Sequence, residues 1–329
     1  MKRDTPRYIT DLKGALYFRR RGWDTVRIKS AFGTPEFWAE YAMIQKGTAP
    51  APKGMTFTAL IGSYRRSERY TGLKPRTRRD YDGILANIEA RLGSARPDGL
   101  ARKHVIALRD SNAETVRFAN YVVQVIRILM EHAIDIGMIK ENPAKGVKLL
   151  KSKAEPRKPW PADTVNEFRS AYEYDARERL LFELLIGTGQ RIGDVLRMQW
   201  GHIDGDGINV TQGKTGKPLW VPFTPHLRAA LAAAPRRNLT ILTRFDGRKA
   251  WAYRGAADAM MTARRAIGAE AYDIHSLRHT AASELALAGC TDELIAAVTG
   301  QSMAMVARYT VHARQKVRAI KAQSKREGI

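Results

Sequence analysis

The second half of the chain holds five side chains whose chemistry would suit attack on a phosphodiester. They are Arg191, Lys214, His275, Arg278 and Tyr309. Two arginines can neutralise the non-bridging oxygens as charge accumulates in the transition state. A histidine adds a hydrogen bond, and a lysine can protonate a departing 5′ oxygen. A tyrosine becomes a nucleophile where cationic neighbours favour its phenolate, and the resulting ester would keep the energy of the broken bond.

Each of these side chains also has an ordinary structural explanation. Arg191 begins a predicted helix, where free N–H groups help to bind an oxyanion, but with Asp194 it could equally form a surface ion pair. Lys214 lies in a predicted hairpin turn, where lysines are usually solvated, and Lys217 is a competing candidate. Tyr309 alone could be a buried aromatic that closes a helical domain. Only the combination of all these residues favours chemistry over packing.

The stretch YDIHSLRHTAASELALAG places His275 and Arg278 one helical turn apart, so they share a face. His279 also lies one turn from His275, which raises a metal alternative. A zinc site of that type needs a catalytic Glu after the first His and a third ligand, but the neighbour is Ser276. The single cysteine, Cys290, excludes an internal disulfide and a Cys-based zinc site and suits a reducing compartment. We therefore expect neither a metal nor a cofactor.

The balance of charge indicates a polyanionic partner. Lys and Arg number 56 against 33 Asp and Glu, which gives a net charge of +23 over 329 residues. Such a surface attracts polyanions at long range. The basic residues are spread along the chain without a lipidation motif, and the apolar runs are too short to span a bilayer. We see no signal peptide. Nucleic acid is favoured over a membrane surface.

The first part of the chain predicts a small β-containing module. Residues 15 to 29 alternate aromatic and β-branched residues around a turn near Gly22, which is typical of a hairpin. Three arginines crowd its rim, and we expect them to contact DNA: Arg19, Arg20 and Arg21. Thr34 and Pro35 predict a helix start, with Thr as the N-cap and Pro in the first turn. Residues 46 to 54 predict a linker, because Pro, Gly and Ala dominate them.

Residues 55 to 150 carry apolar residues at three- and four-residue spacing, which predicts a helical domain. One helix is expected over residues 76 to 92 and a long one over residues 115 to 136. Four basic residues stand in or beside the first turn of the former: Lys74, Arg76, Arg78 and Arg79. Helix N-termini bind phosphate through free N–H groups, and basic side chains strengthen such a site. A solvated basic turn fits the local sequence equally well.

Beyond a second linker at residues 151 to 161, the pattern is mostly helical with one interruption. Residues 205 to 223 alternate apolar and polar residues around two glycines, which predicts a small antiparallel sheet with Lys214 in its turn. An apolar helix is expected to end at Gly187. Residues 315 to 329 predict either a short basic amphipathic helix or a frayed tail. The predicted fold class is therefore mainly α (α+β), with a small antiparallel sheet in a mostly helical second domain.

Four stretches of the second half together resemble the signature boxes of the tyrosine recombinase (phage integrase) family, in that family's order. They are TGQRIGDVLRMQW, QGKTGK with WVPF, HSLRHTAAS and the closing TGQ…ARYT. The resemblance covers residues 155 to 318. It implies that Arg191 and Arg278 are the catalytic arginines and that Lys214 is the hairpin lysine. It also implies that His275 is paired with Arg278 and that Tyr309 is the nucleophile.

Two features depart from the family's pattern. The family usually has a His or a Trp after the Gly of the closing box, where this chain has Gln301. An amide can hydrogen-bond a phosphate oxygen or orient the tyrosine, so we include Gln301 among the catalytic residues, but it cannot carry a proton. In addition, the spacing from Gln301 to Tyr309 is one residue shorter than expected, which on a helix means a rotation of about 100°.

The resemblance also implies an arrangement of domains and partners. The expected parts are an arm-type DNA-binding or accessory hairpin module (1–47), a core-type DNA-binding domain (55–150), a catalytic domain (155–318) and a basic tail (319–329). The implied partners are double-stranded DNA attachment sites, further copies in a homotetramer, and DNA-bending or excision accessory proteins, with no membrane. The implied location is the bacterial cytoplasm, in association with the nucleoid.

The implied activity is site-specific recombination through a 3′-phosphotyrosyl intermediate, which would integrate and excise a phage genome or genomic island. A recombinase that resolves chromosome or plasmid dimers is an alternative, as is a type IB topoisomerase with similar chemistry and little sequence preference. An alternative of a different class is a catalytically impaired DNA-binding relative that acts as a regulator. Gln301 and the short closing box keep that alternative open.

Overall fold

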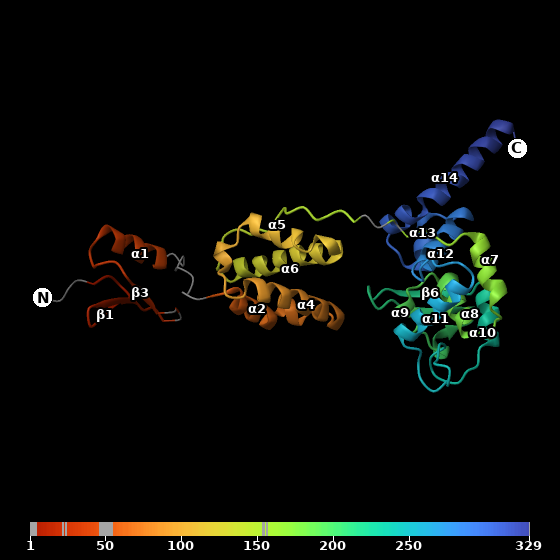
Figure 1. Cartoon of the computed structure of the whole chain (residues 1–329), viewed down its shortest axis with the longest axis horizontal. Helices are drawn as coiled ribbons and strands as arrows, with labels where there is room; N and C mark the ends of the chain where they lie inside the picture. The colour runs from red at the N-terminus through yellow and green to blue at the C-terminus, as the bar shows by residue number, and fades with distance from the viewer. Residues whose placement is uncertain are drawn as a thin grey trace. The chain divides into compact units, whose positions relative to one another are not determined.

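Figure 1 shows the computed structural model of the chain, which describes residues 5–21, 23, 25–45, 55–152, 155 and 157–328. The chain divides into two compact units, Met1–Ala154 and Glu155–Ile329. Among the described residues, no helix has both the length and the apolar character needed to cross a membrane. The fold is mainly α with two small antiparallel sheets, which confirms the predicted class.

Unit 1 begins with a three-stranded antiparallel sheet and one helix. These elements are β1 (Ile9–Leu12), β2 (Ala15–Phe18), β3 (Val26–Ile28) and α1 (Pro35–Gln45). The pairing of β2 with β3 confirms the predicted hairpin, whereas β1 was not predicted. The Thr34 hydroxyl accepts a hydrogen bond from the Phe37 amide at 3.2 Å, so it is the predicted cap. The predicted turn residue Gly22 and the predicted linker at 46–54 lie outside the described residues.

The remainder of unit 1 is helical, as predicted. Its elements are α2 (Phe57–Arg66), α3 (Glu68–Thr71), α4 (Pro75–Leu92), η1 (Pro97–Gly99), α5 (Arg102–Asp110), η2 (Ala113–Thr115) and α6 (Val116–Asp135). Helix α6 packs against α2, α4 and α5. Its apolar residues recur every three or four positions, and Val122, Ile126 and Leu129 are fully buried. The predicted long helix is therefore the central element of this core.

Unit 2 is built around helix α8 and contains the second sheet. Its elements are α7 (Ala162–Ala171), α8 (Arg177–Thr188), α9 (Ile192–Val195), η3 (Trp200–His202), β4 (Ile203–Asp204), β5 (Gly207–Thr211), β6 (Pro218–Pro222), α10 (Pro225–Ala233), α11 (Tyr253–Ala266), α12 (Ser276–Leu287), α13 (Asp292–Thr299) and α14 (Met303–Glu327). Helix α8 is buried along most of its length because α10, α11 and α12 all pack on it. Phe168 and Phe182 stack at 4.2 Å between ring centroids in this core.

The second sheet confirms the predicted hairpin at residues 205 to 223. Strands β5 and β6 pair antiparallel, with Ile208 opposite Val221 on the buried face. The turn between them spans six residues and contains Lys214, as predicted. Lys214 is exposed near its tip.

Two expectations for unit 2 need correction. Helix α8 continues one residue past Gly187 and ends at Thr188, because Gly189 takes the left-handed conformation (φ 61°) that closes the helix. The basic tail is neither a separate short helix nor frayed, because α14 runs without a break from Met303 to Glu327. Figure 1 shows the second half of α14 projecting beyond the rest of unit 2. The tail therefore continues the helix that carries Tyr309.

Candidate active site

Arg191 is placed by the sharp reversal between α8 and α9. It is the N-cap residue of α9, with extended backbone (φ −73°, ψ 146°). The preceding Gly189 turns the chain, and a Cβ there would lie 3.0 Å from the Thr299 methyl group. Only glycine therefore combines the left-handed turn with this approach of α13. The half-buried Arg191 donates to the side-chain oxygen of Gln212 at 3.4 Å.

The predicted pairing of Arg191 with Asp194 is present but is not the main contact of that carboxylate. The Arg191–Asp194 distance is 3.8 Å. Asp194 accepts shorter hydrogen bonds from Arg197 (2.5 Å) and from the backbone N–H of Gly213 in the hairpin turn (2.8 Å). Because Asp194 is shared in this way, Arg191 keeps donor capacity for another anion.

Arg278 lies on α12, which packs against both α8 and α14. It is only 8% exposed, and its Nη1 donates to the Gly189 carbonyl at 2.9 Å. Its Nη2 is buried and has no hydrogen-bond partner among the described residues. Burial, with repulsion by Arg191, lowers the pKa of Arg278 to about 10, and Asp194 and Tyr309 oppose that shift. The guanidinium stays charged at neutral pH and holds an unused donor, which a phosphate oxygen would satisfy.

His275 stands just before α12 and is half-buried. Burial lowers its pKa, and the positive charges of Arg157 and Arg191 add to that effect, although Asp273 opposes them. The imidazole is therefore neutral near pH 7 and can act as an acceptor as well as a donor. In the part of the chain that the structure describes, no three His, Cys, Asp or Glu side chains gather as metal ligands would.

Tyr309 lies on α14 against α12. Its ring stacks on the buried His279, with ring centroids 3.7 Å apart and planes inclined by 28°. The sequence pattern raised His279 only as a metal ligand, whereas the structure uses it to hold the tyrosine ring. Tyr309 also lies close enough to Arg278 to raise the pKa of its guanidinium. The predicted nucleophile and one predicted arginine thus lie on two helices that pack against each other, α14 and α12.

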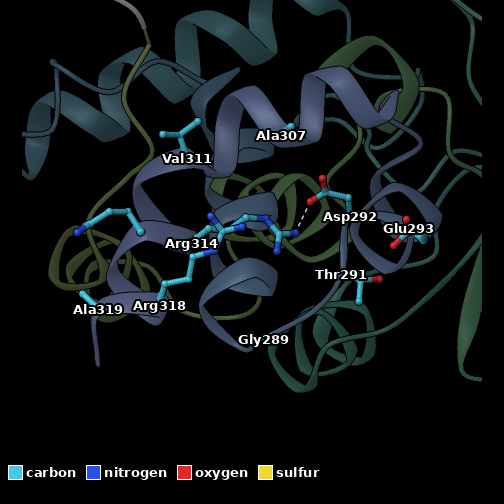
Figure 2. A pocket seen from close by; sticks show the side chains of 10 residues that line it. Gly289, Thr291, Asp292, Glu293, Ala307, Val311, Arg314, Arg318 and Ala319 are labelled. Atoms are coloured by element: carbon cyan, nitrogen blue, oxygen red, sulfur yellow. Dashed lines mark hydrogen bonds and ion pairs between the residues drawn. The ribbon is translucent and has the colours of Figure 1, made fainter. Parts of the chain in front are cut away.

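Arg314 anchors α14 (Figure 2). Its guanidinium bonds the Asp292 carboxylate at the start of α13, the Cys290 carbonyl at 3.2 Å and the Thr310 hydroxyl at 3.1 Å. A hollow of about 770 Å³ lies beside this contact, between α13 and α14. It contains none of the predicted catalytic residues. Arg314 thus attaches α14, the helix that carries Tyr309, to the start of α13.

Gln301 follows the left-handed Gly300 that ends α13. Its side chain is 8% exposed, and its Oε1 is buried without a hydrogen-bond partner among the described residues. Its backbone N–H donates to the Thr299 hydroxyl at 3.3 Å. One residue, Ser302, separates it from α14, which carries Tyr309.

The hairpin that carries Lys214 is attached to Arg191 by a buried amide. Gln212, two residues before Lys214, is 0% exposed. It accepts from Arg191 and donates to Gln190 at 2.7 Å. Gln190 in turn donates to the Thr299 carbonyl at 3.3 Å. Both glutamines lie inside the quoted motifs, but a neutral amide can neither carry charge nor transfer a proton, so neither was predicted as a site residue.

Four of the predicted DNA-contacting residues of unit 1 lie where the sequence placed them, at the start of α4. Lys74 is the N-cap residue and Arg79 is exposed. Arg76 forms an ion pair with Asp80 at 3.1 Å. The guanidinium of Arg78 bonds backbone carbonyls at the end of α3 and lies 5.6 Å from the Tyr70 ring centroid. Arg78 thus has a packing role that the sequence did not indicate.

The three arginines near the N-terminus follow β2 and are exposed. The guanidinium of Arg20 lies over the rings of Tyr8 and Trp23, at 5.5 and 4.6 Å from their centroids. Arg19 lies 5.9 Å from the centroid of the Tyr17 ring. Aromatic faces therefore hold two of these cations in place on the surface.

Comparison with known proteins finds a family model that matches part of the chain. Residues 160–316 match the model of the phage integrase family. The integrase of Escherichia phage HK022 is 26% identical over 178 residues, which are 52% of this chain and 48% of that protein. The chain spans about half the length of the curated relatives it matches.

Two solved structures share the fold. A lambda integrase dimer bound to a COC′ core site has a TM-score of 0.69 and 22% identity, over 94% of this chain and 96% of that one. A lambda integrase tetramer bound to a Holliday junction has a TM-score of 0.68 and 20% identity, with the same coverage. The region that matches the family model contains all six predicted catalytic residues. In residues 160–316 the chain carries a domain of the phage integrase family.

Proposed function

We propose that the chain is a site-specific tyrosine recombinase that cleaves and rejoins DNA to integrate and excise a mobile element such as a prophage or genomic island. The observation that carries this proposal is the buried, charged guanidinium of Arg278, which is near enough to Tyr309 for their charges to interact. The Nη2 of this guanidinium has no hydrogen-bond partner among the described residues. Leaving such a donor unsatisfied is unfavourable, and a phosphate oxygen would satisfy it. The phage integrase domain supports the same conclusion.

In the proposed reaction, Arg191 and Arg278 bind the non-bridging oxygens of one phosphodiester. The Tyr309 hydroxyl oxygen attacks the phosphorus, the bond to the 5′ oxygen breaks, and a 3′-phosphotyrosyl ester forms. The two guanidinium groups stabilise the charge that accumulates on the phosphate oxygens during this exchange. A free 5′ hydroxyl then attacks the ester and releases the tyrosine, so a strand is rejoined without an external energy source.

Two protons must move in the cleavage step. We assign acceptance of the phenolic proton to His275, because its lowered pKa leaves the imidazole neutral near pH 7. We assign donation of a proton to the departing 5′ oxygen to Lys214, which the hairpin turn presents to solvent. Gln301 is buried, and its Oε1 has no partner among the described residues, so it would orient a neighbouring donor rather than transfer a proton.

The proposed partner is double-stranded DNA at an attachment site. The basic residues at the start of α4 and after β2 would contact its phosphates, which makes binding strongly dependent on salt. The related lambda structures are a dimer on a core site and a tetramer on a Holliday junction, and we propose a tetramer for this chain during strand exchange. Accessory DNA-bending or excision proteins and a cytoplasmic location belong to the same proposal.

The proposal is tested by trapping the covalent intermediate. Purified protein is mixed with a pool of nicked duplexes that includes the DNA flanking its gene, and the products are separated after denaturation with SDS. A protein band shifted by the mass of DNA is expected for the wild type. It should be absent for Tyr309→Phe and strongly reduced for Arg278→Ala. Sequencing of the trapped DNA then identifies the site, and one preferred sequence would separate a recombinase from a topoisomerase.

The competing function is a DNA-binding regulator without catalysis, which Gln301 keeps open. Native gel retardation on the same duplexes measures binding without chemistry. Retardation by the wild type without any covalent band would refute the recombinase and favour the regulator. Formation of a covalent band only after Gln301→His would identify Gln301 as the cause of a lost activity.

A further inference from the structure

We propose that Gln212 is a positioning residue for the cleavage reaction, which holds Arg191 and the hairpin of Lys214 in a single arrangement. The inference rests on the proposed function and extends it to a residue that touches no substrate. Gln212 is 0% exposed, so any effect on DNA must pass through the groups that it holds. Its neighbours belong to the α8–α9 turn, the hairpin and the end of α13.

The side-chain amide of Gln212 uses its whole hydrogen-bonding capacity. Its Nε2 donates to the Gln190 Oε1 at 2.7 Å and to the Thr299 carbonyl at 3.0 Å. Its Oε1 accepts from the Arg191 guanidinium at 3.4 Å and from the Thr215 hydroxyl at 3.0 Å. A primary amide has two N–H donors and one oxygen with two lone pairs, so all four positions are filled.

These four contacts fix which way the amide faces. If the oxygen and nitrogen exchanged places, an N–H would point at the Arg191 guanidinium, which has only donors, and the oxygen would point at the Thr299 carbonyl. Both contacts would be repulsive in a buried site. Gln212 therefore has one favourable orientation, and Arg191 and Thr215 must both lie on its oxygen side.

The backbone of Gln212 ties it to the turn that carries Lys214. Its N–H donates to the Lys217 carbonyl at 3.0 Å, and its carbonyl accepts from the Gly216 N–H at 2.7 Å. The side chain is also held by close packing, because a Cβ on Gly300 would lie 2.5 Å from its Nε2. A shift of the side chain would therefore move the turn and the guanidinium of Arg191 together.

The isosteric variant Gln212→Met removes all four side-chain hydrogen bonds and keeps the apolar volume. Gln212→Glu keeps the acceptors that face Arg191 and Thr215 but places an oxygen against the Thr299 carbonyl. The matched control is Gln315→Met, which makes the same chemical change on the exposed surface of α14. Unchanged far-ultraviolet circular dichroism and retained DNA binding are required before rates are compared.

Two nicked substrates separate the groups that Gln212 positions. One has the normal 5′ oxygen at the cleaved bond, and the other has sulfur in its place. A thiolate leaves without a proton, so the sulfur substrate does not need Lys214. We expect Gln212→Met to form covalent complex about 10- to 100-fold more slowly on the oxygen substrate, because small displacements of catalytic groups have effects of this size. The loss of rate should be smaller on the sulfur substrate. On the oxygen substrate, the rate of Gln212→Glu should fall between the rates of Gln212→Met and the wild type.

Limited trypsin digestion of the free protein gives a readout that does not depend on activity. Trypsin does not cleave the bond between Lys217 and Pro218, because it does not cut before proline. The turn therefore offers one tryptic bond, after Lys214. Gln212→Met should be cut there faster than Gln315→Met. Equal cutting would overturn the inference, even if the wild type made no covalent complex and the proposed function failed.

Among the kinetic outcomes, two would contradict the inference while the proposed function stands. The first is cleavage of the oxygen substrate by Gln212→Met within twofold of the Gln315→Met rate. The second is an equal loss on both substrates, which would show that Gln212 does not act on the hairpin of Lys214.

Discussion

The stacking of His279 on Tyr309 makes a quantitative prediction about the cleavage rate. Replacing His279 with alanine removes the ring that lies 3.7 Å from the tyrosine ring, between α12 and α14. A stacked aromatic pair contributes about 0.5–1.5 kcal/mol beyond its buried area. If that energy serves to hold Tyr309 in its attacking orientation, its loss slows cleavage by about 2- to 13-fold.

A phenylalanine at the same position should restore most of the rate. Burial lowers the pKa of His279, and the positive charges of Arg157 and Arg278 add to that shift, although Asp273 and a hydrogen bond with the Arg157 backbone oppose it. The imidazole is therefore neutral near pH 7. His279→Phe thus replaces one neutral ring with another and keeps the stack, while it removes every hydrogen bond that the imidazole makes.

The assay is single-turnover formation of the covalent complex on a nicked duplex, with protein in excess over DNA. At saturating protein all of the DNA is bound, so the rate does not depend on DNA affinity and reports the cleavage step. Thermal unfolding of His279→Ala and His279→Phe provides the control for folding. A rate for His279→Ala equal to that of the wild type would refute the role of the stack. So would a loss in His279→Phe as large as the loss in His279→Ala.

Two further predictions concern the framework of unit 2. Glu183 is fully buried and bonds Arg169 at 2.9 and 3.0 Å and Arg179 at 2.8 Å, so Glu183→Gln should destabilise unit 2 by about 3–5 kcal/mol and lower its melting temperature by about 6–20 °C. Calorimetry measures the melting temperature. The control Asp206→Asn, in the exposed pair with Arg228, should change that temperature little, and an equal drop for both variants would refute the prediction. Although burial, the largest influence, raises the pKa of Asp273, hydrogen bonds from Arg157 and Ser276 hold it below its ordinary 3.8. The stabilisation from Asp273 is thus present above about pH 4 and is lost as the pH falls through the lowered pKa. Asp273→Asn lacks this carboxylate, so its urea midpoint should change less between pH 6 and pH 3 than the midpoint of the wild type.

Local features of the fold could be predicted from the sequence because they depend on neighbouring residues. The apolar spacing of residues 115 to 136 indicated the central helix α6, and the Thr34 cap and the β5–β6 hairpin followed from short patterns. The candidate active-site residues were found because arginine, histidine, lysine and tyrosine are chemically distinctive and lie in recognisable motifs. Their catalytic roles stay predictions until the covalent intermediate is trapped.

Other features of the fold and the site could be seen only in the tertiary structure, because they depend on contacts between distant parts of the chain. Strand β1 was missed because its four residues, Ile-Thr-Asp-Leu, show no alternation of apolar and polar side chains, and it exists through its pairing with β2. The sequence could identify Gln212 only as an amide within a motif, His279 only as a second histidine, and Arg314 only as a basic residue. Their roles come from partners 20 or more residues away, and hydrogen bonds or ring contacts over such separations leave no periodic signal in the chain. The residue types that could attack a phosphodiester were thus determined locally, whereas the placement of Arg191, Arg278 and Tyr309 was determined by the packing of α8, α12, α13 and α14.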